Sequence, residues 1–200
     1  MPANLFADLP ARIFLGIRRT GRALAVSGIA ISAWMLLTAV QWPQPLAPVV
    51  PGADGYVTIP HAAVSPERTR LYRAVFDATQ GAAAPQQLLP ALNMAGSELN
   101  ALGAAGVPLR MAKFVVVFHG AAVDGILDRQ HYEAKFHTAN PNLELLAQLK
   151  RHGVALYVCG QYLAAEHIDP ATLSRDVTVA SDALIVLITY QNDGYAVLEF

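Results

Sequence analysis

The chain has 200 residues, a formal net charge of −1 and a single cysteine, and 54% of its residues are hydrophobic. The near-neutral charge argues against a nucleic-acid partner, and one cysteine with six dispersed histidines argues against a structural zinc site. The phosphate-binding motifs GxxxxGK(S/T) and GxGxxG and the hydrolase motif GxSxG do not occur, so we expect no cofactor and no metal.

The first fifty residues differ in composition from the rest. Residues 1–22 carry four arginines against one acid, Asp8, and residues 23–40 contain no charge. A basic segment, an apolar run and a proline-rich exit are typical of an export signal. The apolar run also approaches the ~20 residues that span a bilayer, so an uncleaved anchor is the alternative. We assign residues 1–42 to a signal peptide or signal anchor and residues 43–66 to a proline-rich linker.

This assignment predicts a periplasmic or otherwise exported domain, or an inner-membrane-anchored one with the domain outside. Only the N-terminal segment would then meet the membrane. Without that segment's charges, 10 basic residues stand against 14 acidic ones, a mildly acidic surface. In an oxidising compartment the lone thiol would be buried, paired between chains, or used in chemistry.

From residue 67 to residue 200, strand and helix patterns alternate. The expected strands cover 71–77, 113–118, a stretch ending at Cys159, 177–179 and 195–200. The expected helices run from about Pro90 to 102, over 126–136, from Asn140-Pro141 to His152, and from a Ser181 cap to about Gln191. The third of these helices would bury Leu143, Leu146 and Leu149. The alternation predicts a three-layer α/β/α domain with a mainly parallel sheet.

Cys159 is the strongest candidate for chemistry. It ends a strand and Gly160 follows, and ligands of open α/β sheets bind at the carboxyl ends of parallel strands. The N-terminus of a following helix would favour the thiolate. His119 and Gly120 end another strand, and the imidazole would help the thiol if the two strands are neighbours. The alternatives are a small buried cysteine and a histidine that binds the backbone in a turn.

Two amide side chains and one helix complete the predicted features. Gln161 and Asn140 could donate hydrogen bonds into the same crevice, although a helix cap explains Asn140 better. The segment 183–191 is apolar nearly all round, which is typical of a helix buried on every side. We therefore expect this helix to contribute to an interface between copies of the chain.

Several motifs together resemble the DsrE/DsrF-like family. They are VVVFHG at 115–120, Asn-Pro-Asn at 140–142, Gly153-Val154 followed by VCGQ at 158–161, and QNDGY at 191–195. The resemblance extends from about Tyr72 to Phe200. It implies a five-stranded α/β/α fold and homotrimers or hexamers. In sulfur-relay members a cysteine after the third strand carries persulfide sulfur, and Cys159 matches that position.

Two functions follow from these observations. In the first, an exported domain carries or transfers sulfane sulfur as a persulfide on Cys159, with a thiol-bearing protein as donor or acceptor. His119 would tune the thiol, while Gly120, Gly160, Gln161 and Asn140 would line the binding crevice. In the second, the domain is a non-catalytic oligomeric module that binds a small ligand or assists a partner, and Cys159 is structural.

Overall fold

The computed structural model describes residues 42–200, so the predicted signal or anchor lies outside the described residues apart from Trp42. Within this part of the chain, no helix is long and apolar enough to cross a membrane.

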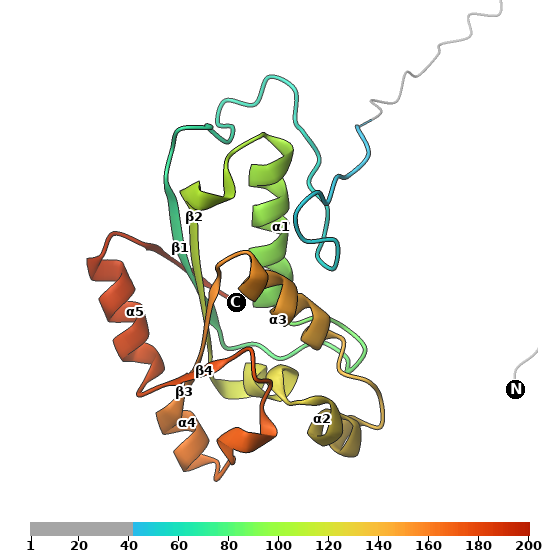
Figure 1. Ribbon diagram of the computed structural model, residues 1–200, viewed down its shortest axis with the longest axis vertical. Helices are drawn as coiled ribbons and strands as arrows, with labels where there is room; N and C mark the ends of the chain where they lie inside the picture. The colour runs from blue at the N-terminus through green and yellow to red at the C-terminus, as the bar shows by residue number, and fades with distance from the viewer. Residues whose placement is uncertain (1–41) are drawn as a thin grey trace, which may run out of the picture. The chain divides into compact units, whose positions relative to one another are not determined.

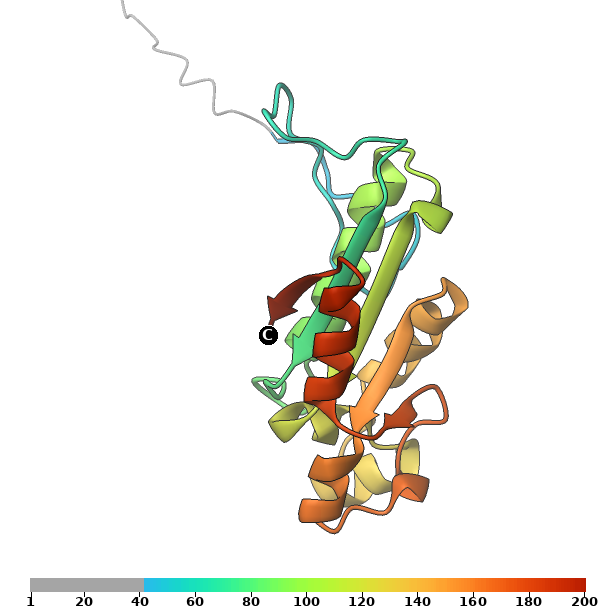
Figure 2. The ribbon, with the colours of Figure 1, turned by 90° about the vertical axis from the view of Figure 1, so that its left-hand side faces the viewer.

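All five strands of the sheet run parallel (Figures 1 and 2). Their order across the sheet is β4-β3-β2-β1-β5. The strands are β1 (Tyr72–Ala78), β2 (Ala112–Phe118), β3 (Ala155–Cys159), β4 (Thr178–Ala180) and β5 (Ala196–Glu199). The predicted α/β fold with a mainly parallel five-stranded sheet is therefore confirmed. The four strands with a predicted first residue each begin within one residue of it.

Helices cover both faces of this sheet (Figure 1). On one face, α1 (Pro90–Ala104) packs on β1 and β2, and α3 (Asn142–Arg151) packs on β3. On the other face, α5 (Ala183–Asn192) packs across β1, β2 and β3. The shorter α2 (Arg129–Phe136) and α4 (Gly160–Ala165) follow β2 and β3. Three 3-10 turns, η1 (Leu109–Met111), η2 (Gly120–Ile126) and η3 (Pro170–Thr172), complete the connections.

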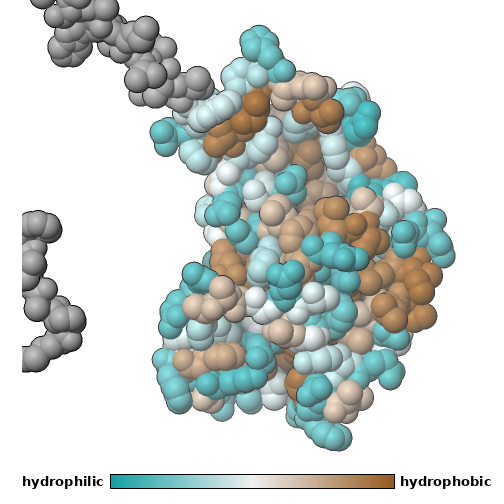
Figure 3. Space-filling view, turned by 180° about the vertical axis from the view of Figure 1, so that it is seen from behind, coloured by the Kyte–Doolittle hydropathy of each residue, from teal (hydrophilic) through white to brown (hydrophobic). Residues whose placement is uncertain are grey.

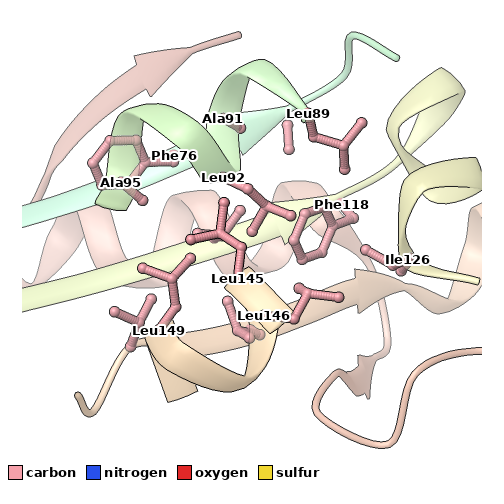
Figure 4. Packing of buried hydrophobic residues seen from close by; sticks show 14 of the residues in the cluster. Phe76, Leu89, Ala91, Leu92, Ala95, Phe118, Ile126, Leu145, Leu146 and Leu149 are labelled. Atoms are coloured by element: carbon pink, nitrogen blue, oxygen red, sulfur yellow. The ribbon is translucent and has the colours of Figure 1, made fainter. Parts of the chain in front are cut away.

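The central strand β2 is buried from Phe114 to Phe118, as expected for a parallel strand with helices on both faces. Phe76 and Phe118 belong to the larger core under α1 and α3, where α3 adds Leu145, Leu146 and Leu149 (Figure 4). Burial of each such side chain contributes about 1.5–3 kcal/mol. The predicted α3 stripe is thus correct at Leu146 and Leu149, but Leu145 is buried in place of Leu143, which is only partly covered.

Part of the stretch predicted as a linker packs against the domain. Val50 is fully buried, and the side chain of Asn100 on α1 accepts hydrogen bonds from the Val49 and Val50 amides at 3.0 and 2.8 Å. The same amide group donates to the carbonyls of Val50 and Asp54, both at 3.0 Å. A buried polar side chain is stable only when it is hydrogen-bonded, so Asn100 fixes this segment to α1.

Two predicted helix starts differ from the structure. The predicted helix over 126–136 is divided, because Asp128 accepts a hydrogen bond from the His131 amide at 2.8 Å and α2 begins only at Arg129. At the last helix, Asp182 and not Ser181 is the cap, since its carboxylate accepts from the Leu184 amide at 2.9 Å.

Candidate functional site

Three side chains that can take part in acid–base or thiol chemistry lie at the carboxyl edge of the sheet, on the α5 face. Val75, Val117 and Cys159 pack together under α5. Asp77 follows Val75 by two residues and His119 follows Val117 by two, and side chains two apart on a strand share a face. The paired residues Phe118 and Val158 place His119 and Cys159 next to each other as β2 and β3 leave the sheet.

The Cys159 sulfur is held by the start of two helices. It accepts a hydrogen bond from the Tyr162 amide of α4 at 3.4 Å and one from the Ala183 amide of α5 at 3.2 Å. The Oδ1 atom of Asp182 lies 3.9 Å from the sulfur and is the acceptor for the thiol proton. The residue is only 5% exposed. Two converging N–H groups suit a negatively charged sulfur, whereas the low exposure restricts access to it.

Gly160 allows this close arrangement. A Cβ atom at that position would lie 2.7 Å from the Ala180 carbonyl oxygen, which real Cβ atoms do not approach. A glycine is therefore required where the chain turns from β3 into α4 beside the end of β4.

His119 is directed away from the thiol. Its Nε2 atom lies 2.7 Å from Oδ1 of Asp77 on β1, which borders β2 on the side opposite β3. The side chains of His119 and Asp77 are 26% and 12% exposed, so the pair is largely screened from water. In residues 42–200 no hydrogen bond joins the imidazole to the Cys159 sulfur. The structure brings the two residues to one edge but pairs each with a different carboxylate.

The other three predicted binding residues have different surroundings. Gly120 has a φ of +59° and begins the 3-10 turn after β2, a conformation that favours glycine. Gln161 is exposed on the first turn of α4. Asn140 is buried and fully engaged: it donates to the carbonyls of Gly125 and Leu127 at 3.0 and 2.8 Å and accepts from the Asn142 amide at 2.9 Å. Asn140 therefore has a structural position outside the crevice.

Two carboxylates of the site, Asp77 and Asp182, were not predicted. Asp77 is the one charged residue in the otherwise apolar run that follows Arg73, and a charge inside a buried strand is a signal that it has a partner. Asp182 lies directly before an apolar helix, the position of a capping residue. Both signals are present in the sequence, but neither identifies His119 or Cys159 as the partner.

The comparison with family models agrees with this architecture. The model described as the DsrE/DsrF-like family matches residues 73–200, which include all five strands except the first residue of β1. The chain belongs to the DsrE/DsrF-like family. No curated protein sequence matches it.

Solved structures similar to the chain include two proteins. One is a protein of unknown function, MTH1491 from Methanobacterium thermoautotrophicum, with 19% sequence identity and a TM-score of 0.49. The match covers 64% of this chain and 99% of that one. The other is the ychN protein from E. coli, with 16% identity, a TM-score of 0.45, and coverage of 65% of this chain and 100% of that one.

The Asp77–His119 pair gives a first prediction. Replacing His119 with alanine should lower the free energy of unfolding by about 1.5–3 kcal/mol, because the screened Asp77 carboxylate loses its hydrogen-bond partner. Urea unfolding at neutral pH measures the change.

The matched control is His131→Ala. His131 pairs with Asp128 at 2.8 Å, but the two side chains are 42% and 35% exposed. An exposed pair of this kind contributes about 0–1 kcal/mol. Equal losses in the two variants would contradict the distinct role of the Asp77–His119 pair.

Proposed function

We propose that this chain carries sulfane sulfur as a persulfide on Cys159. The observation that supports the proposal is the convergence of the Tyr162 and Ala183 amides on the sulfur at 3.4 and 3.2 Å. These donors belong to the first turns of α4 and α5, whose N-terminal ends carry partial positive charge. They would stabilise the thiolate that sulfur transfer requires. Family membership is consistent with this chemistry.

The transfer balances without a cofactor. The Cys159 thiol gives its proton to Asp182, and the thiolate attacks the outer sulfur of a donor persulfide R–S–SH. A new S–S bond forms at Cys159, the donor S–S bond breaks, and the donor leaves as a thiolate that takes up a proton. An acceptor thiolate then attacks the outer sulfur and Cys159 departs as the thiolate. Sulfane sulfur moves between thiols with no net oxidation.

His119 would act on the incoming molecule. Its Nε2 atom is bound to Asp77, which fixes the ring. The protonated imidazole would give its Nδ1 proton to the departing donor thiolate and take up another from water. Gly120 and Gln161 lie at the same edge, in the turns after β2 and β3. Because the cysteine is only 5% exposed, a partner sulfur reaches Cys159 through local movement of the residues around it.

The second candidate is an oligomeric module without turnover. The low exposure of Cys159 favours it, because a buried sulfur that accepts two amide hydrogen bonds can serve purely as a helix cap. In that function the domain binds a small ligand or assists a partner protein.

Labelling of the thiol distinguishes the two candidates. We expect iodoacetamide to alkylate the folded protein, and incubation with glutathione persulfide to leave sulfur on the chain that cyanide releases as thiocyanate. Cys159→Ser should abolish both signals, because this is the single cysteine of the chain. His119→Ala should retain alkylation but load sulfur more slowly.

If alkylation requires denaturant and cyanide releases no sulfur, the persulfide-carrier function is excluded and the oligomeric binding module remains. Equal sulfur loading by the wild type and His119→Ala would exclude the proton-transfer role of His119 and leave the carrier.

We further propose that the chain forms a homotrimer or hexamer through α5. Leu184, Ile185 and Ile188 are 60%, 54% and 54% exposed, although Ala183 and Val186 on the same helix are buried. Figure 3 shows hydrophobic residues gathered on the side of the molecule where Figure 1 places α5. Exposed apolar patches of this kind mark interaction sites.

Light scattering tests this interface. Ile188→Lys should convert the oligomer to a monomer, because a charge would be buried in the apolar contact. Ile59→Lys is the control: Ile59 is 44% exposed in the segment before β1, so its replacement should leave the oligomer intact. A wild-type protein that is already monomeric at micromolar concentration would disprove the interface.

Export through residues 1–42 is also a proposal, supported by the order of basic, apolar and proline-rich segments in the sequence. Fusion of this segment to an alkaline phosphatase that is active only outside the cytoplasm should give activity. A fusion of residues 43–66 should give none. The mass of the exported fusion tells a cleaved signal from a retained anchor, and an inactive first fusion would rule out export.

A further inference from the structure

An apolar groove lies on the α1 face of the sheet, beside the edge strand β5. Its volume is about 530 Å³, within the size range of small-molecule sites. Phe76, Phe114 and Phe200 line it, and their rings pack on one another with centroids 5.3 and 5.9 Å apart. Met94 and Leu198 also line the groove and remain 37% and 38% exposed.

The groove exists because the helices cover β5 incompletely. The helix α1 packs on β1 and β2, while α5 packs on the opposite face of the sheet. The segment before β1 supplies a further wall, which is held in place by a 2.7 Å hydrogen bond from the Glu67 amide to the Tyr72 hydroxyl oxygen. The result is a preformed hollow between fixed elements.

Among the charged residues that line the groove, Glu98 has no partner. Arg70 is paired with Glu67 at 2.9 Å. The guanidinium of Arg73 is engaged elsewhere: it donates to the Asp193 carbonyl at 3.3 Å and lies 6.0 Å from the ring of Tyr195, in the turn between α5 and β5. Within residues 42–200, no hydrogen bond or ion pair reaches the Glu98 carboxylate.

The surroundings of Glu98 favour a cation. The residue is exposed, so its carboxylate is open to a ligand, but the apolar wall removes part of its water and raises its pKa. A positive charge beside it would replace that lost hydration with a charge-assisted hydrogen bond. A carboxylate ligand would instead meet a like charge.

We propose that this groove binds a hydrophobic amine, with the apolar chain against the three phenylalanines and the protonated amine against Glu98. The proposal goes beyond sulfur transfer and is independent of it, because Cys159 is not among the lining residues. Loss of sulfur loading in Cys159→Ser should therefore leave amine binding unchanged.

Three probes with one apolar chain and different head groups test the proposal: n-octylamine, 1-octanol and octanoate. Isothermal titration of the full chain at neutral pH should give the tightest binding for octylammonium and the weakest for octanoate. Glu98→Gln should weaken octylammonium about tenfold and leave octanol unchanged, because only the charged hydrogen bond is lost. Ala196→Trp should abolish binding of all three, because Ala196 lines the groove and is exposed.

Several results would overturn the proposal. Octanoate binding as tightly as octylammonium would show that charge has no part in recognition. An unchanged ratio of octylammonium to octanol affinity in Glu98→Gln would remove Glu98 from the site. Binding that persists in Ala196→Trp would place the probes elsewhere on the chain, including the apolar N-terminal segment. If the wild type binds none of the probes and Ala196→Trp dissociates its oligomer, a second copy of the chain fills the groove.

Discussion

The parallel direction of all five strands determines where chemistry can occur in this domain. Because every strand ends at the same edge, residues far apart in the sequence leave the sheet together. Asp77, His119 and Cys159 come from three consecutive strands in the order β1, β2, β3. An antiparallel sheet would have placed His119 at the opposite edge, so the candidate site depends on this constraint before it depends on any side-chain contact.

Within that edge, the side chains form two separate pairs. The imidazole is bound to Asp77 toward β1, and the thiol lies 3.9 Å from Asp182 beyond β3. The two pairs have different surroundings, since backbone amides of two helices contact the sulfur and only a carboxylate contacts the Nε2 atom. A mechanism in which His119 deprotonates Cys159 directly would require the ring to leave Asp77. If Asp182 accepts the thiol proton and His119 acts on the donor, the ring can stay bound to Asp77.

The sequence predicted the parts of the fold that depend on local pattern. The continuous apolar run correctly predicted the buried strand β2. Gly160 correctly marked the end of the strand that carries Cys159. Prediction failed where a polar side chain forms hydrogen bonds with residues far away in the sequence. Asn100 fixes residues 49 and 50, which are about fifty positions earlier in the chain, and no local pattern reports that contact. For the same reason the sequence placed His119 and Cys159 at one edge but could not give the direction of either side chain.

The edge strand β5 joins the surface on α5 and the groove on the α1 face. It has four residues, is mostly exposed, and pairs with β1 alone. Short edge strands avoid unwanted pairing, but they also give the helices on either side little sheet to cover. On one side the exposed leucine and isoleucines of α5 remain, and on the other Leu198 and Met94 remain beside the groove. Since the chain uses a single short strand here, a ligand or second copy that binds either surface would stabilise β5 and, through its pairing with β1, the Asp77 end of the candidate site.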